Sequence, residues 1–327
     1  MEGRPFLPAA SRAGEERRLQ ALLAFFALGL HYIRAVNPSH DILRTLRTAG
    51  YEASEARAVA FLLLEEGFGV GRVAVYADKV RDFSEEESLQ LENMLQRLAA
   101  GTPVQYVLGR TTFCGLSFGV GPGVLIPRPE TEELVAIAAE MVAGKGKRGD
   151  GEAHNNYIKG ATLIDLGTGS GCIAVTLKKR YPALRVEGWD ISPAALAIAR
   201  ANAERLGADV RLREADLLAA TLPACPEGSF LVSNPPYVRR SEAAAMEAIV
   251  LDHEPHTALF VPDDDPLCFY RAIERLARQC RTAGVALEVN AALADETAAL
   301  FGAFADVTVL PDAFGRPRFV RTGGFTG

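Results

Sequence analysis

Hydrophobic and polar positions follow a helical period in the first third of the chain. Up to about residue 100, apolar residues recur every three or four positions, as in Leu91, Leu95 and Leu98. Ser84 and the three glutamates after it supply a helix cap and an acidic first turn to that run. We predict a small all-α domain over residues 39–102, preceded by an N-terminal extension, residues 1–38, of undefined structure.

The pattern changes twice before the chain reaches residue 161. Residues 103–124 are rich in β-branched and aromatic positions interrupted by glycine, which predicts a β-hairpin linker. Residues 130–142 return to helical spacing, whereas residues 144–160 are glycine-rich, charged and aperiodic, as in a surface insertion.

From residue 161 onward, short apolar runs alternate with amphipathic runs. The runs predict strands at 162–166, 185–189, 210–213, 230–233, 285–289, 306–310 and 318–321, and helices at 172–180, 193–206, 267–281 and 293–301. Such alternation is typical of an α/β fold in which helices wrap a parallel sheet and ligands bind at the carboxyl ends of the strands.

Composition and charge narrow the class of protein. The 327 residues are 49% hydrophobic and 23% charged, as in a globular protein with a sizeable core, and a net charge of -6 offers no general footprint for nucleic acid. Five scattered cysteines without a C-x-x-C pair predict reduced thiols and a cytoplasmic protein. The longest apolar run, Ala21–Leu30, is about half of the length that a membrane-spanning helix needs. This run follows two arginines, as the apolar part of a secretory signal does, but no cleavage pattern comes after it. We therefore predict a buried helix and no association with a membrane.

A glycine loop follows the first strand of the predicted sheet, in Leu163-Ile-Asp-Leu-Gly-Thr-Gly-Ser-Gly171. Its three glycines permit a sharp turn and close approach of a ligand to the backbone. The third glycine comes one position earlier than in the dinucleotide fingerprint, and Asp165 at the strand end would repel phosphate. The loop therefore suits a zwitterionic amino acid or a cationic sulfonium better than a pyrophosphate. A tight turn without a ligand is the alternative.

Acids follow the next two strands. Asp190 lies about 20 residues beyond the glycine loop, where a carboxylate can accept both hydroxyls of a ribose. On its own it could equally cap the helix that follows Ser192. Asp216 could accept the amino group of adenine or be a surface acid. The glycine loop and Asp190 together predict a nucleoside site.

The most specific motif is Asn234-Pro-Pro-Tyr237, at the end of the fourth strand. Two prolines fix the backbone and remove two N–H donors, so nearby carbonyls remain free to accept hydrogen bonds. Asn234 adds a side-chain carbonyl and Tyr237 a flat ring. Such a row of acceptors can bind a planar –NH2 group, orient its nitrogen and stabilise the positive charge that develops there. The alternative is a stiff loop that only ends a strand.

These motifs resemble those of the S-adenosylmethionine-dependent methyltransferases that modify planar nitrogens of adenine, cytosine or glutamine. Pro103-Val-Gln-Tyr-Val-Leu-Gly109 and Leu125-Ile-Pro-Arg-Pro-Glu-Thr-Glu-Glu-Leu134 are similar to segments of the release-factor glutamine methyltransferases of HemK/PrmC type. The resemblance covers residues 42–320. It implies a class I methyltransferase fold, Rossmann-like with a mostly parallel seven-stranded sheet over residues 125–327, and an α-helical domain that helps to bind the release factor.

The resemblance also implies roles for individual residues. The cofactor, S-adenosylmethionine, and its product S-adenosylhomocysteine would be held by Asp165, Gly167, Thr168, Gly169, Ser170, Gly171, Asp190, Asp216, Leu217 and Asn234. The substrate glutamine of the Gly-Gly-Gln loop would be held by Asn234, Pro235, Pro236 and Tyr237, with Arg128, Glu130 and Glu132 at the border of the pocket. Leu217 stands where the family often has an aromatic residue, so the contacts with adenine are less defined.

Other functions remain as alternatives. A glutamine methyltransferase acting on a ribosomal protein is the nearest, and a DNA adenine-N6 methyltransferase is less favoured because the chain is acidic and lacks a cluster of basic residues. A sensor that only binds a nucleoside would not need the acceptor row. His253-Glu-Pro-His256 carries two imidazoles and a carboxylate, but Pro255 would break the helix of a two-histidine site, so we expect no metal.

Overall fold

The computed structural model describes residues 38–77, 79–144 and 160–327. The chain divides into two compact units between Gly109 and Arg110, and each has its own hydrophobic core. The extension predicted at residues 1–38 and the insertion predicted at residues 144–160 lie, apart from their end residues, outside the described residues.

The first unit is α-helical, as predicted. Its described elements are α2 (Pro38–Thr48), α3 (Ala53–Leu62), the π-helical turn η1 (Leu63–Gly67), α4 (Arg72–Tyr76), α5 (Glu85–Ala99) and α6 (Val104–Leu108). The start of α5 is a capping box, since the Ser84 hydroxyl accepts from the Glu87 N–H and the Glu87 carboxylate accepts from the Ser84 N–H. Leu91, Leu95 and Leu98 are buried in the core of the unit.

The linker is a shorter hairpin than residues 103–124 predicted. Strands β1 (Arg110–Phe113) and β2 (Leu116–Gly119) pair antiparallel, but residues 104–108 form helix α6 instead of a strand. The residues that begin and end this segment favour a helix, despite the β propensity of the residues between them. Pro103 precedes the helix with its φ preset near the helical value, and Gly109 ends it in the left-handed region at φ +69°. Arg97 donates to two of the last carbonyls of the turn.

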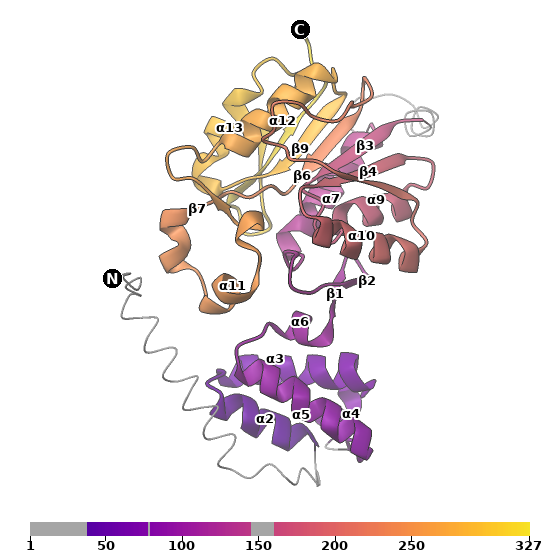
Figure 1. The fold of residues 1–327 in the computed structure, drawn as a ribbon, viewed down its shortest axis with the longest axis vertical. Helices are drawn as coiled ribbons and strands as arrows, with labels where there is room; N and C mark the ends of the chain where they lie inside the picture. The colour runs from indigo at the N-terminus through magenta and orange to yellow at the C-terminus, as the bar shows by residue number, and fades with distance from the viewer. Residues whose placement is uncertain (1–37, 78, 145–159) are drawn as a thin grey trace, which may run out of the picture. The chain divides into compact units, whose positions relative to one another are not determined.

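The second unit is built on a seven-stranded sheet with the order β10-β11-β9-β6-β3-β4-β5 (Figure 1). Its strands are β3 (Thr162–Leu166), β4 (Arg185–Asp190), β5 (Val210–Glu214), β6 (Phe230–Ser233), β9 (Gly284–Glu288), β10 (Thr308–Pro311) and β11 (Pro317–Thr322). Only β11 runs antiparallel to its neighbours β9 and β10, so the prediction of a mostly parallel sheet is confirmed.

Helices cover both faces of this sheet (Figure 1). On one face lie α7 (Pro129–Val142), α9 (Cys172–Arg180) and α10 (Pro193–Leu206), and on the other α12 (Cys268–Gln279) and α13 (Ala294–Leu300). Successive strand residues point to opposite faces, so Leu163 packs in the α7 and α9 core while Ile164 packs in the α12 core. The predicted boundaries of these elements agree with the structure to within two residues.

Between β6 and β9 the chain makes an excursion away from the sheet. Strands β7 (Val238–Arg239) and β8 (Phe260–Val261) pair at its base, and η2 (Arg240–Ala245), α11 (Ala248–His253) and η3 (His256–Ala258) lie between them. We call residues 240–259 the wall segment. It stands beside the carboxyl ends of β3 and β6, where the strand order reverses and α/β sheets bind their ligands.

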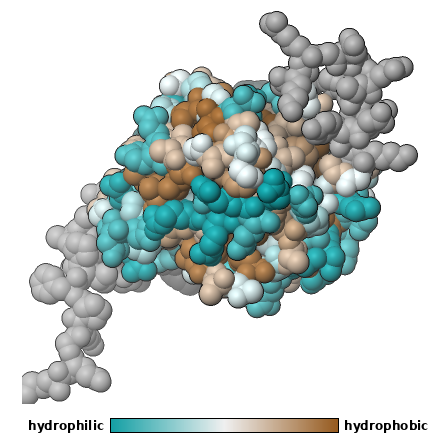
Figure 2. All heavy atoms as spheres, turned by 90° about the horizontal axis from the view of Figure 1, so that it is seen from above, coloured by the Kyte–Doolittle hydropathy of each residue, from teal (hydrophilic) through white to brown (hydrophobic). Residues whose placement is uncertain are grey.

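The surface view in Figure 2 shows mainly hydrophilic side chains with separate, small hydrophobic areas. Within the described ranges, no helix has the length and apolar character to span a bilayer. All five cysteines lie in those ranges and are free thiols, as their irregular spacing predicted.

Candidate active site

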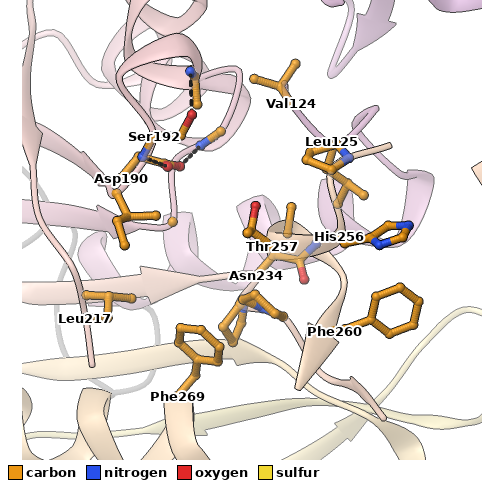
Figure 3. Close-up of a pocket in the computed structure, with 18 of the residues that line it drawn as sticks. Val124, Leu125, Asp190, Ser192, Leu217, Asn234, His256, Thr257, Phe260 and Phe269 are labelled. Carbon is orange, nitrogen blue, oxygen red and sulfur yellow. Dashed lines mark hydrogen bonds between the residues drawn. The ribbon is translucent and has the colours of Figure 1, made fainter. Parts of the chain in front are cut away.

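A cavity of about 950 Å³ opens at the carboxyl ends of the parallel strands. Residues from the loops after β3, β4, β5 and β6 line one side of it, and the wall segment and the start of β8 line the other. Among the lining residues are Gly167, Gly169, Asp190, Asp216, Leu217, Asn234, Pro235, Pro236, His256 and Phe260. Asn234 lies between the end with Asp190 and the end with His256 (Figure 3). Six of the ten residues predicted to hold the cofactor therefore meet in one cavity.

Asp190 is held at the end of β4 by backbone donors. One carboxylate oxygen accepts from Gly169 N at 2.9 Å and the other from Ser192 N at 2.9 Å (Figure 3). Each carboxylate oxygen has two acceptor positions, so both can still accept a further donor from the cavity. The carboxylate thus ties the glycine loop to the start of α10 and faces the cavity.

Asp165 lies behind the glycine loop and does not line the cavity. Its side chain is fully buried, and one oxygen accepts from the Thr168 hydroxyl at 2.6 Å and from Ala174 N at 3.2 Å. The other oxygen has no hydrogen-bond partner among the described residues. Burial raises the pKa of Asp165 to about 7, although the two hydrogen bonds lower it. Its observed role is to hold the loop from behind.

Three more loop residues predicted to hold the cofactor, Thr168, Ser170 and Gly171, also lie away from the cavity lining. Thr168 packs over Gly188, where a Cβ would come within 2.8 Å of the Thr168 hydroxyl oxygen. Gly171 caps α9 in the left-handed region at φ +79°, with Ala199 closing the space beside it. Thr168, Ser170 and Gly171 therefore shape the turn, whereas Gly167 and Gly169 are the loop residues that line the cavity.

The raised pKa of Asp165 predicts a pH-dependent stability. Between its unfolded value near 4 and about 7, the folded state retains a proton that the unfolded state has lost, so this contribution to stability is lost as pH rises through about 7. Asp165→Asn removes the titration. We expect the melting temperature of this variant, relative to the original protein, to increase between pH 5 and pH 8; the corresponding change in the free energy of unfolding has an upper limit of about 3 kcal/mol, at about 1.4 kcal/mol per pH unit between pH 5 and about 7. A difference that stays constant with pH would contradict the assignment.

The side of the cavity beyond Asp190 is apolar. Leu217 is 7% exposed and belongs to the core on the α12 face, against which Phe269 also packs. Both side chains line the cavity (Figure 3). Asp216 uses one oxygen to accept from Leu218 N, which keeps the turn after β5 closed. A flat, weakly polar group would fit beside Leu217 and Phe269.

The Asn234-Pro-Pro-Tyr237 motif follows β6 at the floor of the cavity. The Asn234 amide donates through Nδ2 to the Thr131 hydroxyl at 3.0 Å. Within the described residues, no donor occupies Asn234 Oδ1 or the main-chain carbonyls of Asn234, Pro235 and Pro236. The row of acceptors that the two prolines predicted is therefore present.

Tyr237 differs from the prediction. Its side chain does not line the large cavity; instead it lines a second cavity of about 140 Å³ together with Arg128, and its hydroxyl donates to Glu288 at 3.0 Å. Burial, with the charge of Glu288, raises the pKa of Tyr237 above its usual range. Asn234 and Pro235 line both cavities, so the smaller one lies directly behind the acceptor row.

None of the three residues predicted to border the pocket lines the large cavity, and Arg128 lines only the smaller one. Glu132 accepts from Cys114 N at 2.8 Å in the hairpin, and Glu130 faces Arg316, 3.8 Å away. Successive helix residues are rotated by about 100°, so neighbours in α7 cannot share a face. The residue between them, Thr131, is the one that reaches the motif.

Two further residues were missed in the sequence. Glu288 ends the buried strand β9 and accepts from both Thr131 and Tyr237, and it carried the same signal that pointed to Asp190, an acid at the carboxyl end of an apolar strand. Glu254 is buried and accepts from Arg128 at 2.6 Å and from Ile126 N at 3.2 Å. That pairing gives the carboxylate of the His253-Glu-Pro-His256 motif a structural role.

Known proteins match the chain over both units. The family described as the Methyltransferase small domain matches residues 153–256, and the PrmC N-terminal domain matches residues 40–109. With the strand order of the sheet and the glycine loop, these matches define a class I methyltransferase.

Two relatives identify the family. A release factor glutamine methyltransferase from Bacteroides thetaiotaomicron is 41% identical over 83% of this chain and 93% of its own length. One from Bacillus subtilis is 39% identical over 67% of this chain and 73% of its own length. The chain belongs to the release factor glutamine methyltransferase family, as the motifs predicted.

Proposed function

We propose that this enzyme transfers the methyl group of S-adenosylmethionine to the side-chain amide nitrogen of the glutamine in the Gly-Gly-Gln loop of a peptide chain release factor. The observation that carries the proposal is the acceptor row after β6, because Asn234, Pro235 and Pro236 line the large cavity and no donor from the described chain occupies their carbonyl oxygens. Family membership supports the same substrate class.

The cavity fits S-adenosylmethionine by chemistry. Gly167 and Gly169 would approach the methionine part closely, and Asp190 would accept hydrogen bonds from the ribose hydroxyls. The apolar side of the cavity beside Leu217 and Phe269 would bind adenine. Phe269, which lines the cavity, would provide the aromatic side chain that Leu217 does not. When bound, S-adenosylmethionine supplies a methyl group that is activated by its sulfonium.

The substrate glutamine would enter beside Asn234. An amide nitrogen is a poor nucleophile because its lone pair is delocalised, so orientation and close approach are the main tasks of the site. Asn234 Oδ1 and the carbonyl of Pro235 or Pro236 would accept the two N–H groups and stabilise the positive charge that develops on nitrogen. The nitrogen loses one proton to water after it gains the methyl group, so no general base or metal is required.

The helical unit is proposed to recognise the release factor through a surface that takes no part in the chemistry. Removing residues 1–109 leaves the unit that begins at Arg110, which has its own core. We expect the affinity for S-adenosylmethionine to stay unchanged while kcat/KM for a whole release factor falls at least about tenfold, equivalent to about 1.4 kcal/mol of binding. A truncated enzyme that methylates the whole factor at the original rate would assign the helical unit another role.

Labelled methyl transfer tests the proposed function as a whole. The protein is incubated with labelled S-adenosylmethionine and, separately, with a release factor, a ribosomal protein and DNA. We expect label only in the release factor, at the glutamine of its Gly-Gly-Gln loop. Label in the ribosomal protein or DNA instead would reject this substrate.

Since the five thiols are free, we place the reaction in the reducing cytoplasm.

A further inference from the structure

Four side chains, two of the acceptor-row motif and two from α7 and β9, form a continuous set of hydrogen bonds. Asn234 Nδ2 donates to Thr131 Oγ1 at 3.0 Å, and the Thr131 hydroxyl donates to Glu288 Oε2 at 2.8 Å. From the other side, the Tyr237 hydroxyl donates to Glu288 Oε1 at 3.0 Å. Three elements contribute, namely α7, the loop after β6 and the end of β9.

The direction of these hydrogen bonds follows from the number of protons available. A threonine hydroxyl has one proton and can donate only once. The Glu288 side chain is buried at 1% exposure, and a buried carboxylate is the strongest acceptor within reach, so it takes the Thr131 proton. Thr131 can then only accept from Asn234, which requires the –NH2 end of the amide to face it.

We propose that Thr131 and Glu288 are positioning residues that fix the orientation of the Asn234 amide, so that its carbonyl and not its –NH2 end faces the substrate. The inference rests on the function proposed above. A reversed Asn234 would present N–H donors to the N–H donors of the glutamine, and the two groups could not bind.

The charge state of Glu288 controls this orientation. The Glu288 carboxylate accepts hydrogen bonds from Thr131 on α7 and from Tyr237 in the loop after β6, and it is influenced by the charges of Arg318 on β11 and Glu130 on α7. Tyr270 from α12 donates to its main-chain oxygen. Burial raises the pKa of Glu288, although the hydrogen bonds from Thr131 and Tyr237 and the charge of Arg318 lower it.

Protonation would reverse the set of hydrogen bonds. A protonated Glu288 can donate to Thr131, whose own proton is then free to point at Asn234 Oδ1. The rate should therefore fall as pH decreases through the pKa of Glu288, which burial raises. This acid limb is a signature that a purely structural role for Glu288 would not produce.

A matched pair of variants tests the role of the hydroxyl. Thr131→Val keeps the branched shape and removes the hydroxyl, while Thr131→Ser keeps the hydroxyl. With saturating S-adenosylmethionine and a release factor, we expect kcat of Thr131→Val to fall about tenfold to a hundredfold, with unchanged cofactor affinity, and Thr131→Ser to restore most of the rate. Thr297→Val is the control, because Thr297 is equally buried but its hydroxyl has no partner among the described residues.

Glu288→Gln provides an independent test if Thr131→Val does not fold. We expect its single-turnover rate to be lowered and to lose the acid limb of the original enzyme. The proposal is overturned if folded Thr131→Val keeps the original kcat, if Thr131→Ser is as slow as Thr131→Val, or if Glu288→Gln retains the acid limb. Failure of the proposed function would look different, since the unaltered enzyme itself would then not methylate a release factor.

Discussion

Replacing Asn234 with alanine should lower kcat for glutamine methylation by about a hundredfold or more. The variant loses the side-chain carbonyl that orients the substrate –NH2 group and stabilises the charge developing on it, a loss comparable to that of one preorganised group in an oxyanion hole. The strand and both prolines remain, so cofactor affinity and melting temperature should change little. The single-turnover rate with saturating cofactor and a Gly-Gly-Gln peptide measures this chemistry apart from binding.

Asn234→Asp is the matched comparison. It keeps an acceptor oxygen, but it cannot donate to Thr131 and places a negative charge beside the sulfonium, so we expect partial activity. An alanine variant that turns over at the original rate would reduce Asn234 to a loop residue and remove the centre of the mechanism.

The second large effect is expected at Asp190. Asp190→Ala should remove two hydrogen bonds to the ribose, each with a charged acceptor and worth about 1.5 kcal/mol or more. The sum corresponds to at least about a hundredfold in the dissociation constant of S-adenosylmethionine. The same change also removes the acceptor for Gly169 N and Ser192 N, so the glycine loop loses its attachment to α10.

Calorimetry with S-adenosylhomocysteine measures the effect at Asp190. Asp216→Ala is the control, because Asp216 is an acid in the same cavity that holds only the turn after β5. We expect its effect on affinity to be smaller than that of Asp190→Ala. Equal affinities of Asp190→Ala and the unaltered enzyme would show that the ribose binds elsewhere.

The sequence was sufficient to predict the sheet because its signals are local. Buried strands such as residues 162–166 are short and mostly apolar, and glycines or prolines mark the turns between them. The same signals placed Asp190 and Asn234 at the ends of strands β4 and β6, which lie on either side of β3. Because parallel strands end at one edge, sequence order alone was enough to bring these side chains into one cavity.

What could not be predicted depends on contacts between distant parts of the chain. The motif around Glu130 and Glu132 indicated the correct segment of α7, but only packing against the sheet shows that Thr131 faces inward and touches Asn234. Glu288 carries the signal of an acid at the end of an apolar strand, but it is more than fifty residues from Asn234 in the sequence, so only the folded chain shows that the two side chains are linked through Thr131. Helix α6 was mistaken for a strand because its ends, not its composition, determine its structure.

The way in which the wall segment is attached has a consequence for hydrogen exchange. At its two ends the segment continues into the two-residue strands β7 and β8, which pair with each other and not with the seven-stranded sheet, and Glu254 adds an ion pair with Arg128. Strands β3 and β6, in contrast, are paired on both sides along their whole length and buried. Amides of residues 240–259 should therefore exchange through openings that cost much less than global unfolding, whereas those of β3 and β6 should exchange only when the whole sheet opens.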